Sequence, residues 1–208
     1  EFRRVLFRSN NLKYAPFPVV TAPIGMALGG GCEILLHSAA IQAHAETYTG
    51  LVEVGVGVIP GWGGCKEILL RLKNDPKMPK GPIPAVAKAF EMIGTAQVAK
   101  SAFEAKEMGI LRKEDGITMN RDRLLADAKA KALKLAANYA PPKEQTITLP
   151  GPNGIAALKV ALEGLTLQGK VTPHDQTVSL ALAKVLTGGN VDIADPVSEK
   201  DLIKLERS

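Results

Sequence analysis

Two glycine-rich segments, each joined to an acidic residue and followed by an apolar helical pattern, constrain this chain more than any other feature. In the first, GGGCEILL, three glycines at positions 29–31 come before Glu33. In the second, EVGVGVIPGWGG, Glu53 comes first and the helical pattern CKEILLRLK follows. A glycine-rich turn that opens a helix leaves backbone amides free at the positive end of the helix dipole. Each segment therefore predicts a site that stabilises an anion, or an oxygen that becomes anionic during a reaction.

The two acidic residues predict acid–base chemistry at one pocket. Glu33 falls in the first turn of its helix, beside the predicted oxyanion site. Glu53 lies 20 positions further on (53 minus 33), so the two acids meet if the two turns pack together. A pair of carboxyl groups at one site has its proton affinities pushed apart, which lets one act as base and the other as acid. The alternative is that the glycines serve tight turns and both acids face solvent.

Two other glycine motifs fit the sequence less well. The phosphate-binding P-loop needs a Gly-Lys-Ser/Thr tripeptide, which does not occur. The dinucleotide fingerprint needs a third glycine where this sequence has Pro60, and no strand ending in an acid follows. Dinucleotide binding therefore ranks below the acid-pair interpretation.

The composition limits the other classes of function. The chain has 208 residues, enough for one sizeable core with at most a small appended unit. Its net charge of +5 is scattered and mixed with acids, and the aromatic share is only 4%. A scattered surplus is typical of a solvated surface, and few aromatic rings are available to stack on bases. We expect no nucleic acid partner, and no membrane span because no apolar run reaches about 18 residues.

The cysteines and histidines predict no metal site. Cys32 and Cys65 form no CxxC pair and no disulfide framework, which favours a reducing compartment such as the cytoplasm. His37, His44 and His174 share no metal-ligand spacing with one another or with nearby acids. They are therefore interpreted as packing or surface residues.

The chain begins with strand, loop and helix patterns. Residues 17–23 predict a short buried strand, residues 24–31 a mobile glycine-rich segment, and residues 32–40 a helix whose buried side carries Ile34, Leu35 and Leu36. Residues 40–46 alternate like a strand, with Ile41, Ala43 and Ala45 on one face. Residues 51–64 predict a shaped loop, and a helix begins around Gly64 with Ile68, Leu69 and Leu72 on one side.

From Pro82 the pattern becomes helical. Helices are expected over 82–94, 101–109, 121–139, 155–169 and 175–189. Gly94 is a predicted C-cap, and capping boxes are predicted at Ser101 with Glu104 and at Ser198 with Asp201. Leu124, Leu125 and Leu133 lie at helical spacing and are predicted to be ordinary core, the alternative being that the helical part is a surface for assembly.

These patterns predict an α/β chain in three parts. Residues 1–9, EFRRVLFRS, have the composition of a translated cloning linker and are excluded from the fold. Residues 10–115 form the predicted α/β core and residues 116–208 a helical region. The abrupt start and the short final helix indicate a fragment cut at both ends.

At the glycine-rich segments the sequence resembles the crotonase family, the enoyl-CoA hydratases and isomerases. One family segment runs from a strand through a glycine-rich turn into the helix with the first catalytic glutamate, and it resembles FPVVTAPIGMALGGGCEILL. Another carries the second glutamate and a Pro-Gly-x-Gly-Gly turn, and it resembles GLVEVGVGVIPGWGG. The resemblance covers roughly residues 14–115 and preserves the spacing between the two segments. It implies part of the family's spiral α/β core.

The resemblance implies a role for each matched residue. Gly30 would donate one backbone amide of the oxyanion hole to the thioester carbonyl of an acyl-CoA substrate. Glu33 would hold and activate a water, while Glu53 would share that water and deliver a proton to the carbon next to the carbonyl. The implied substrate contacts are Gly29, Gly31, Pro60 and Gly61. The family's isomerases typically keep one of the two acids, so the pair favours hydration of trans-2-enoyl-CoA to 3-hydroxyacyl-CoA in fatty-acid β-oxidation. An isomerase, an acyl-CoA hydrolase and a non-catalytic module remain alternatives.

The C-terminal part resembles a known extension. TMNRDRLLADAKAKAL, YAPP, LQGKVTPHD and VLTGG are similar to the end of bacterial fusions that join a 3-hydroxyacyl-CoA dehydrogenase to a hydratase. This implies a fused upstream dehydrogenase that uses NAD. The crotonase resemblance implies a homo-oligomeric assembly, with no cofactor in this chain and CoA present only as part of the substrate. The family's other oxyanion amide and much of its adenine pocket come from a segment before residue 17 that this sequence lacks. We therefore expect the chain alone to be inactive.

Overall fold

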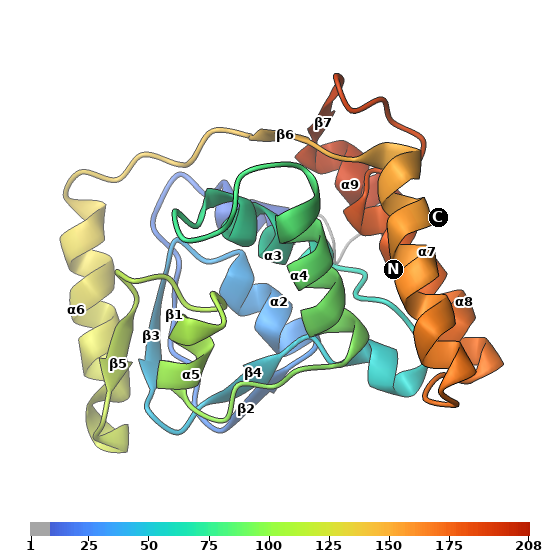
Figure 1. Cartoon of the computed structure of the whole chain (residues 1–208). Helices are drawn as coiled ribbons and strands as arrows, with labels where there is room; N and C mark the ends of the chain where they lie inside the picture. The colour runs from blue at the N-terminus through green and yellow to red at the C-terminus, as the bar shows by residue number, and fades with distance from the viewer. Residues whose placement is uncertain (1–8) are drawn as a thin grey trace. The chain divides into compact units, whose positions relative to one another are not determined.

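The computed structural model describes residues 9–208, which form two compact units (Figure 1). The first unit contains the residues up to Leu51 together with Val98–Lys143, and the second contains Val52–Gln97 with Glu144–Ser208. The predicted linker, residues 1–9, lies outside the described residues except for Ser9. Each unit is thus built from two separate stretches of chain, and the boundary expected near residue 116 falls inside the first unit.

The first unit contains two small parallel sheets. The three-stranded sheet has the order β1-β3-β5, with β1 at Val20–Thr21, β3 at Ala40–His44 and β5 at Gly116–Thr118. The two-stranded sheet pairs β2, Met26–Leu28, with β4, Tyr48–Gly50. The strand predicted at 40–46 is therefore confirmed. At 17–23 only Val20–Thr21 form a strand, and both residues are half-buried, so the prediction of a buried strand there is confirmed only in part. The prediction of a mobile segment at 24–31 is wrong, because residues 26–28 are fixed in register against β4.

Strand β3 is the buried centre of the first unit. Ile41, Ala43 and Ala45 are buried as predicted, and so are Ala40 and His44 on the other face. A parallel strand buried on both faces is typical of sheets covered by helices. Here α6, Leu124–Ala136, packs against β1 and β3, as Figure 1 shows. The short strand is therefore held by packing on both of its faces.

The first unit contains a short helix at residues 9–13, then α2 (Gly30–Leu36), α5 (Ala102–Glu107) and α6. The 3-10 turn η2 (Arg121–Arg123) precedes α6. The capping box predicted at α5 forms only in part: the Ser101 hydroxyl accepts from the Glu104 amide, but the Glu104 carboxylate accepts from the Lys100 amide. On α6, Leu124 is buried, but Leu125 and Leu133 are 77% and 64% exposed. The prediction that these two leucines belong to the core is wrong, because only one face of α6 contacts the strands.

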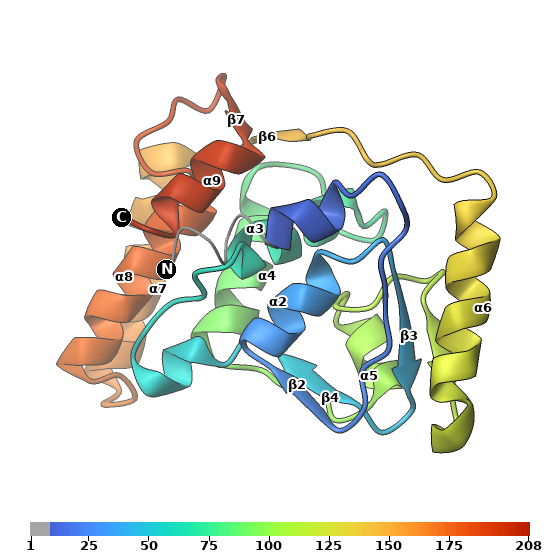
Figure 2. The same ribbon diagram turned by 180° about the vertical axis from the view of Figure 1, so that it is seen from behind.

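The second unit is mainly helical. Its elements are the 3-10 turn η1 (Glu53–Val56), α3 (Gly64–Asn74), α4 (Ile83–Gly94), α7 (Gly151–Leu167), α8 (Pro173–Leu186), α9 (Glu199–Leu205) and the antiparallel strands β6 (Thr146–Thr148) and β7 (Pro196–Ser198). Helix α8 packs against α3, α4, α7 and α9, and its Leu182 is fully buried. Figure 2 shows α8 and α9 side by side. The core of this unit therefore lies around α8.

The sequence predicts helix ends at Gly94, near Gly189 and at Ser198 in the second unit, and the prediction at Gly94 is the one that the structure contradicts. The Ser198 hydroxyl accepts from the Asp201 amide at the start of α9, as predicted, but the Asp201 carboxylate accepts from the Ser198 hydroxyl, so the capping box forms only in part. Gly188 and Gly189 adopt left-handed backbone angles where α8 ends. Gly94, however, is the last residue of α4, and the left-handed position is Ala96, so the predicted C-cap at Gly94 is wrong. Within residues 9–208, no helix is both long and apolar enough to cross a membrane.

Candidate active site

The residue just before α2 is a glycine that the backbone conformation requires. Gly29 has φ 54° and ψ −122°, in a region that a side chain disfavours. Its amide donates to the Gly50 carbonyl of β4 over 2.9 Å, and its carbonyl accepts from the Glu33 amide over 2.9 Å. The amide of Gly29 is therefore used to join the start of α2 to the sheet and is not left for a substrate.

Gly30 and Gly31 are the first two residues of α2, and both are half-buried. Amides in the first turn of a helix have no acceptor within the helix and carry its positive dipole end. The geometry at Gly30 therefore suits the predicted oxyanion donor. A Cβ on Gly31 would meet only the Ala27 Cβ, at 3.8 Å, which is an ordinary contact. Space alone does not require glycine at position 31.

Glu33 lies in the same first turn of α2, and its side chain is only 2% exposed. The structure thus brings together the glycines at 29–31 and the first predicted acid on one helix end. One turn later the His37 Nδ1 donates to the Glu33 carbonyl over 2.7 Å, and the His37 ring is buried. The interpretation of His37 as a packing residue is confirmed. Among residues 9–208, no cluster of His, Cys, Asp and Glu could hold a metal ion.

Glu53 is the first residue of η1, in the second unit, and it is half-buried. Burial raises the pKa of its carboxyl above the ordinary value of 4.5, while hydrogen bonds from the Glu53 and Val52 amides act in the opposite direction. Among the described residues the Glu53 Oε2 finds no hydrogen-bond partner. A half-buried carboxyl with a raised pKa keeps its proton to a higher pH than an exposed carboxyl does, as a proton donor needs.

Glu33 and Glu53 belong to different units, so the meeting of the two acids at one pocket stays a prediction. Pro60 is buried and Gly61 half-buried in the connection between η1 and α3. A Cβ on Gly61 would meet nothing within 4 Å. The structure therefore gives no steric reason for glycine at position 61, and its role beside the substrate also stays a prediction.

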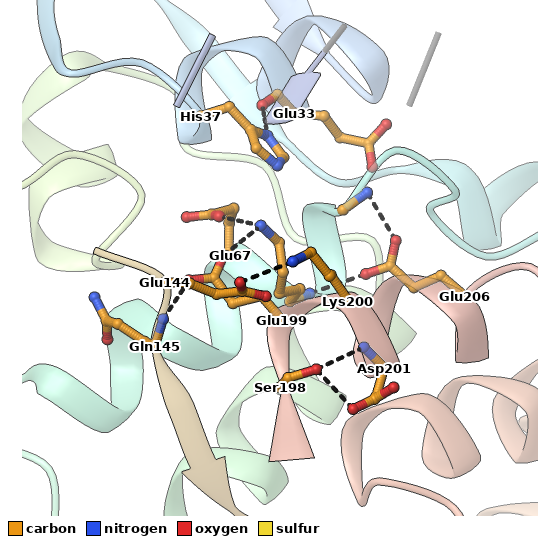
Figure 3. Close-up of polar contacts among 12 residues, drawn as sticks. Glu33, His37, Glu67, Glu144, Gln145, Ser198, Glu199, Lys200, Asp201 and Glu206 are labelled. Atoms are coloured by element: carbon orange, nitrogen blue, oxygen red, sulfur yellow. Dashed lines mark hydrogen bonds and ion pairs between the residues drawn. The ribbon is translucent and has the colours of Figure 1, made fainter. Parts of the chain in front are cut away.

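The start of α3 has a different occupant from the one expected. Helix α3 begins at Gly64 as predicted, after Gly63 with φ 93°. The amides of Gly63 and Lys66 donate to the carboxylate of Glu206, over 2.7 Å to Oε2 and 3.0 Å to Oε1. Figure 3 shows this carboxylate between the two backbone nitrogens. The second predicted anion site is thus occupied by an acid of the chain itself.

Sequence reasoning missed Glu206, which lies 143 positions after Gly63. One local signal existed. Glu206 is the C-cap residue of α9, where the helix dipole disfavours a negative charge. An acid at the carboxyl end of a helix indicates that another group compensates its charge, and here that group is the amino end of α3.

A buried ionic cluster adjoins this contact. The Lys66 side chain is fully buried, and its Nζ lies 2.5 Å from Glu67 Oε1 and 2.9 Å from Glu199 Oε2. The Gln145 amide donates to the other Glu199 oxygen over 3.0 Å. Burial alone would lower the pKa of Lys66, but the charges of the two glutamates raise it above its ordinary value. Lys66 is therefore a cation at neutral pH and joins α3 to the first residue of α9.

A cavity of about 480 Å³ lies in the second unit where α3 connects to α4. Its lining includes Lys73, Asp75, Met78 and Lys80 and none of the predicted site residues. The two cysteines are both buried, and neither forms a disulfide. The cavity and the cysteines therefore lie outside the candidate site.

Comparison with known proteins places these features in context. No protein-family model matches the chain. The chain is 44% identical over 197 residues to the "Probable 3-hydroxyacyl-CoA dehydrogenase" of Bacillus subtilis, covering 94% of this chain and 25% of that protein. It is 32% identical over 124 residues to the "Probable enoyl-CoA hydratase" of Rhizobium meliloti, covering 60% of this chain and 42% of that protein. The chain thus spans a quarter to less than half of these relatives.

A solved structure is also similar. The crystal structure of the enoyl-CoA hydratase from Bacillus anthracis matches with a TM-score of 0.52 and 27% sequence identity. The match covers 89% of this chain and 59% of that one. Nearly the whole described chain therefore follows a fold found in that hydratase.

Proposed function

We propose, on the premise that this chain belongs to the crotonase family of enoyl-CoA hydratases and isomerases, that its parent protein hydrates trans-2-enoyl-CoA thioesters. The product is the 3-hydroxyacyl-CoA. The observation that carries the proposal is the start of α2, where the half-buried Gly30 begins the helix and Glu33 occupies the same turn. The proposed oxyanion donor and the proposed general base therefore lie in the same turn of one helix.

The proposed reaction assigns a step to each group. The Gly30 amide donates to the thioester carbonyl oxygen, where negative charge grows as an enolate-like state forms. Glu33, as a carboxylate, takes a proton from water while the water oxygen bonds to the β-carbon of the double bond. Glu53, as a carboxylic acid, gives a proton to the α-carbon. One water is added, and the two carboxyl groups exchange protonation states, to be reset by proton transfer between turnovers.

The environment of Glu53 supports its role as the donor. Burial raises the pKa of its carboxyl, which favours the protonated form that the step consumes. Paired catalytic acids commonly have environments that push their pKa values apart. This direction is therefore the one that a proton donor to carbon needs.

The partners follow from the chemistry of the product. A 3-hydroxyacyl-CoA is the substrate of a 3-hydroxyacyl-CoA dehydrogenase, the name that the Bacillus subtilis relative carries. We therefore propose a fused dehydrogenase that supplies the NAD-dependent step, with CoA entering this chain only as part of its substrate. A homo-oligomer in the cytoplasm, where the thiols of Cys32 and Cys65 stay reduced, completes the proposal.

The test is the hydration of crotonyl-CoA, followed as loss of the ultraviolet absorbance of the enoyl thioester. In the longer parent protein we expect Glu33→Gln and Glu53→Gln each to lower kcat by about 100 to 10,000-fold. Glu163→Gln on the exposed face of α7 serves as the matched control and should leave the rate unchanged. The 208-residue chain alone is expected to give no turnover. Full activity of both acid variants would contradict the proposal, and double-bond migration or release of free CoA without hydration would assign the isomerase or hydrolase alternative.

A further inference from the structure

We propose that His174 of α8 and Glu206 of α9 position the glycine-rich connection that follows Glu53, and through it the Glu53 carboxyl group. The part that concerns catalysis rests on the proposed function. Both residues lie in the C-terminal stretch of the second unit, far along the sequence from the connection that they contact. Neither was singled out by any sequence motif for this role.

His174 holds the end of the connection nearest to Glu53. Gly57 ends η1 with a left-handed φ of 81°, and its carbonyl accepts from the His174 Nε2 over 3.0 Å. A Cβ built on Gly57 would lie 2.7 Å from the same nitrogen. The imidazole therefore packs directly on the glycine backbone, and only glycine fits both the backbone angle and this contact.

Glu206 holds the other end of the connection. Its carboxylate accepts from the amides of Gly63 and Lys66 and is only 6% exposed. Hydrogen bonds to a charged acceptor in a buried position are stronger than those between neutral groups. The adjoining ion pair of Lys66 with Glu199 fixes the opposite end of α9 on the same helix. Helix α9 thus contacts the start of α3 at both of its own ends.

The connection needs such anchors because of its composition. Glycines at 55, 57, 61 and 63 give it high backbone freedom, and the side chains of Val56 and Val58 are 81% and 54% exposed. Exposed valines supply little packing to hold a loop. Just after η1 the Val58 amide donates to the Glu53 carbonyl over 3.3 Å. Fixing Gly57 and Gly63 therefore restricts the backbone that carries Glu53, and catalytic groups lose rate when misplaced by about 1 Å.

The first arm of the test measures the loop without any reaction. Trp62 is the single tryptophan of the chain and directly precedes Gly63, so its fluorescence reports on this connection. In the 208-residue chain we expect Glu206→Gln and His174→Ala each to increase acrylamide quenching of Trp62. Hydrogen exchange across residues 53–66 should become at least about tenfold faster, as loss of a hydrogen bond predicts. His174→Gln, whose amide can still donate to Gly57, should restore protection, and Glu163→Gln is the matched control.

The second arm measures the carboxyl group and the rate. In Glu206→Gln the pKa of Glu53, followed by carbon NMR of its carboxyl, should move back toward its ordinary value. In the parent protein kcat for crotonyl-CoA should fall about tenfold with little change in KM. Unchanged exchange and quenching in both Glu206→Gln and His174→Ala would overturn the positioning role. If the unsubstituted parent protein does not hydrate crotonyl-CoA, the proposed function is wrong. The quenching and hydrogen-exchange measurements would still decide whether His174 and Glu206 fix the loop. His174 is exposed, so His174→Ala is expected to fold. The test can therefore be decided with this variant if Glu206→Gln does not fold.

Discussion

Helices α2 and α3 both begin after a glycine-rich turn, but the backbone amides at their starts have different partners. Each helix follows a glycine with a left-handed φ, 54° at Gly29 and 93° at Gly63, and neither of these residues offers a side-chain cap. At α3 the free amides donate to Glu206. At α2 the Gly29 amide is bound to β4, and Gly30 follows half-buried as the first helical residue. A glycine-rich turn thus specifies a helix end that can bind an anion, and the rest of the fold determines which anion.

The reason for the difference lies in the partners of each helix. Helix α3 contacts α9, whose last turn carries Glu206 and whose first residue, Glu199, pairs with Lys66. Helix α2 contacts β2 and β4, which offer backbone groups to its start. The start of α3 is therefore a structural joint within the second unit, whereas the start of α2 is the candidate for binding substrate.

The largest expected effect comes from breaking the joint at α3. Lys66→Met removes the cation between two buried glutamates, and loss of one partner from a buried ion pair destabilises by about 3–5 kcal/mol. Denaturant unfolding of the 208-residue chain measures this loss. Lys200→Met is the control, since Lys200 pairs with Glu144 at an exposed position where about 0–1 kcal/mol is typical. Equal losses in the two variants would show that the buried cluster does not stabilise the joint.

A smaller effect, on catalysis alone, is expected at α2. Gly30→Pro deletes the proposed oxyanion donor at the first helical position, where proline is well tolerated. Hydration by the parent protein should fall about 100 to 1000-fold, the effect of removing one such donor. Thermal unfolding of the same variant should change little. Retained activity in a folded Gly30→Pro protein would rule out the Gly30 amide as the donor.

The smallest effect is a pH-dependent change in stability at Glu53. Because burial raises its folded-state pKa, ionisation costs stability as pH rises from the ordinary value of 4.5 through the raised one. Glu53→Gln removes the free-energy cost of ionising this carboxyl in the folded state. The Tm of the variant should therefore be a few degrees higher than that of the unsubstituted chain near pH 7, and the two Tm values should be equal near pH 4. Calorimetry at the two pH values checks this. An equal gain at both would mean that ionisation is not the cause.

The sequence predicted those strands, helix starts and caps that depend on residues close together along the chain. The strand at 40–46, the helix start near Gly64 and the cap at Ser198 follow from alternation, glycine placement and a hydroxyl three residues before an acid. Strand β2 was missed because three residues carry little periodicity and its partner β4 lies beyond a helix. Leu125 and Leu133 were misassigned because helical spacing does not say which face contacts a sheet.

The candidate site was predictable in part for the same reason. The sequence placed the glycines and Glu33 on one helix end because they are neighbours along the chain. It could not identify the anion at α3, since Glu206 approaches only through the packing of α9. Each unit is made from two separate stretches of chain, and this pairing of stretches is likewise a tertiary property that no local pattern encodes.

The most direct measurement is an amide NMR titration of the 208-residue chain with butyryl-CoA, a thioester that cannot be hydrated. The proposed oxyanion role of Gly30 predicts that the Gly30 amide resonance shifts with thioester concentration. Because the Gly63 and Lys66 amides already donate to Glu206, their resonances are expected not to shift. Shifts at Gly63 and Lys66 with none at Gly30 would contradict the division of roles between the two helix starts.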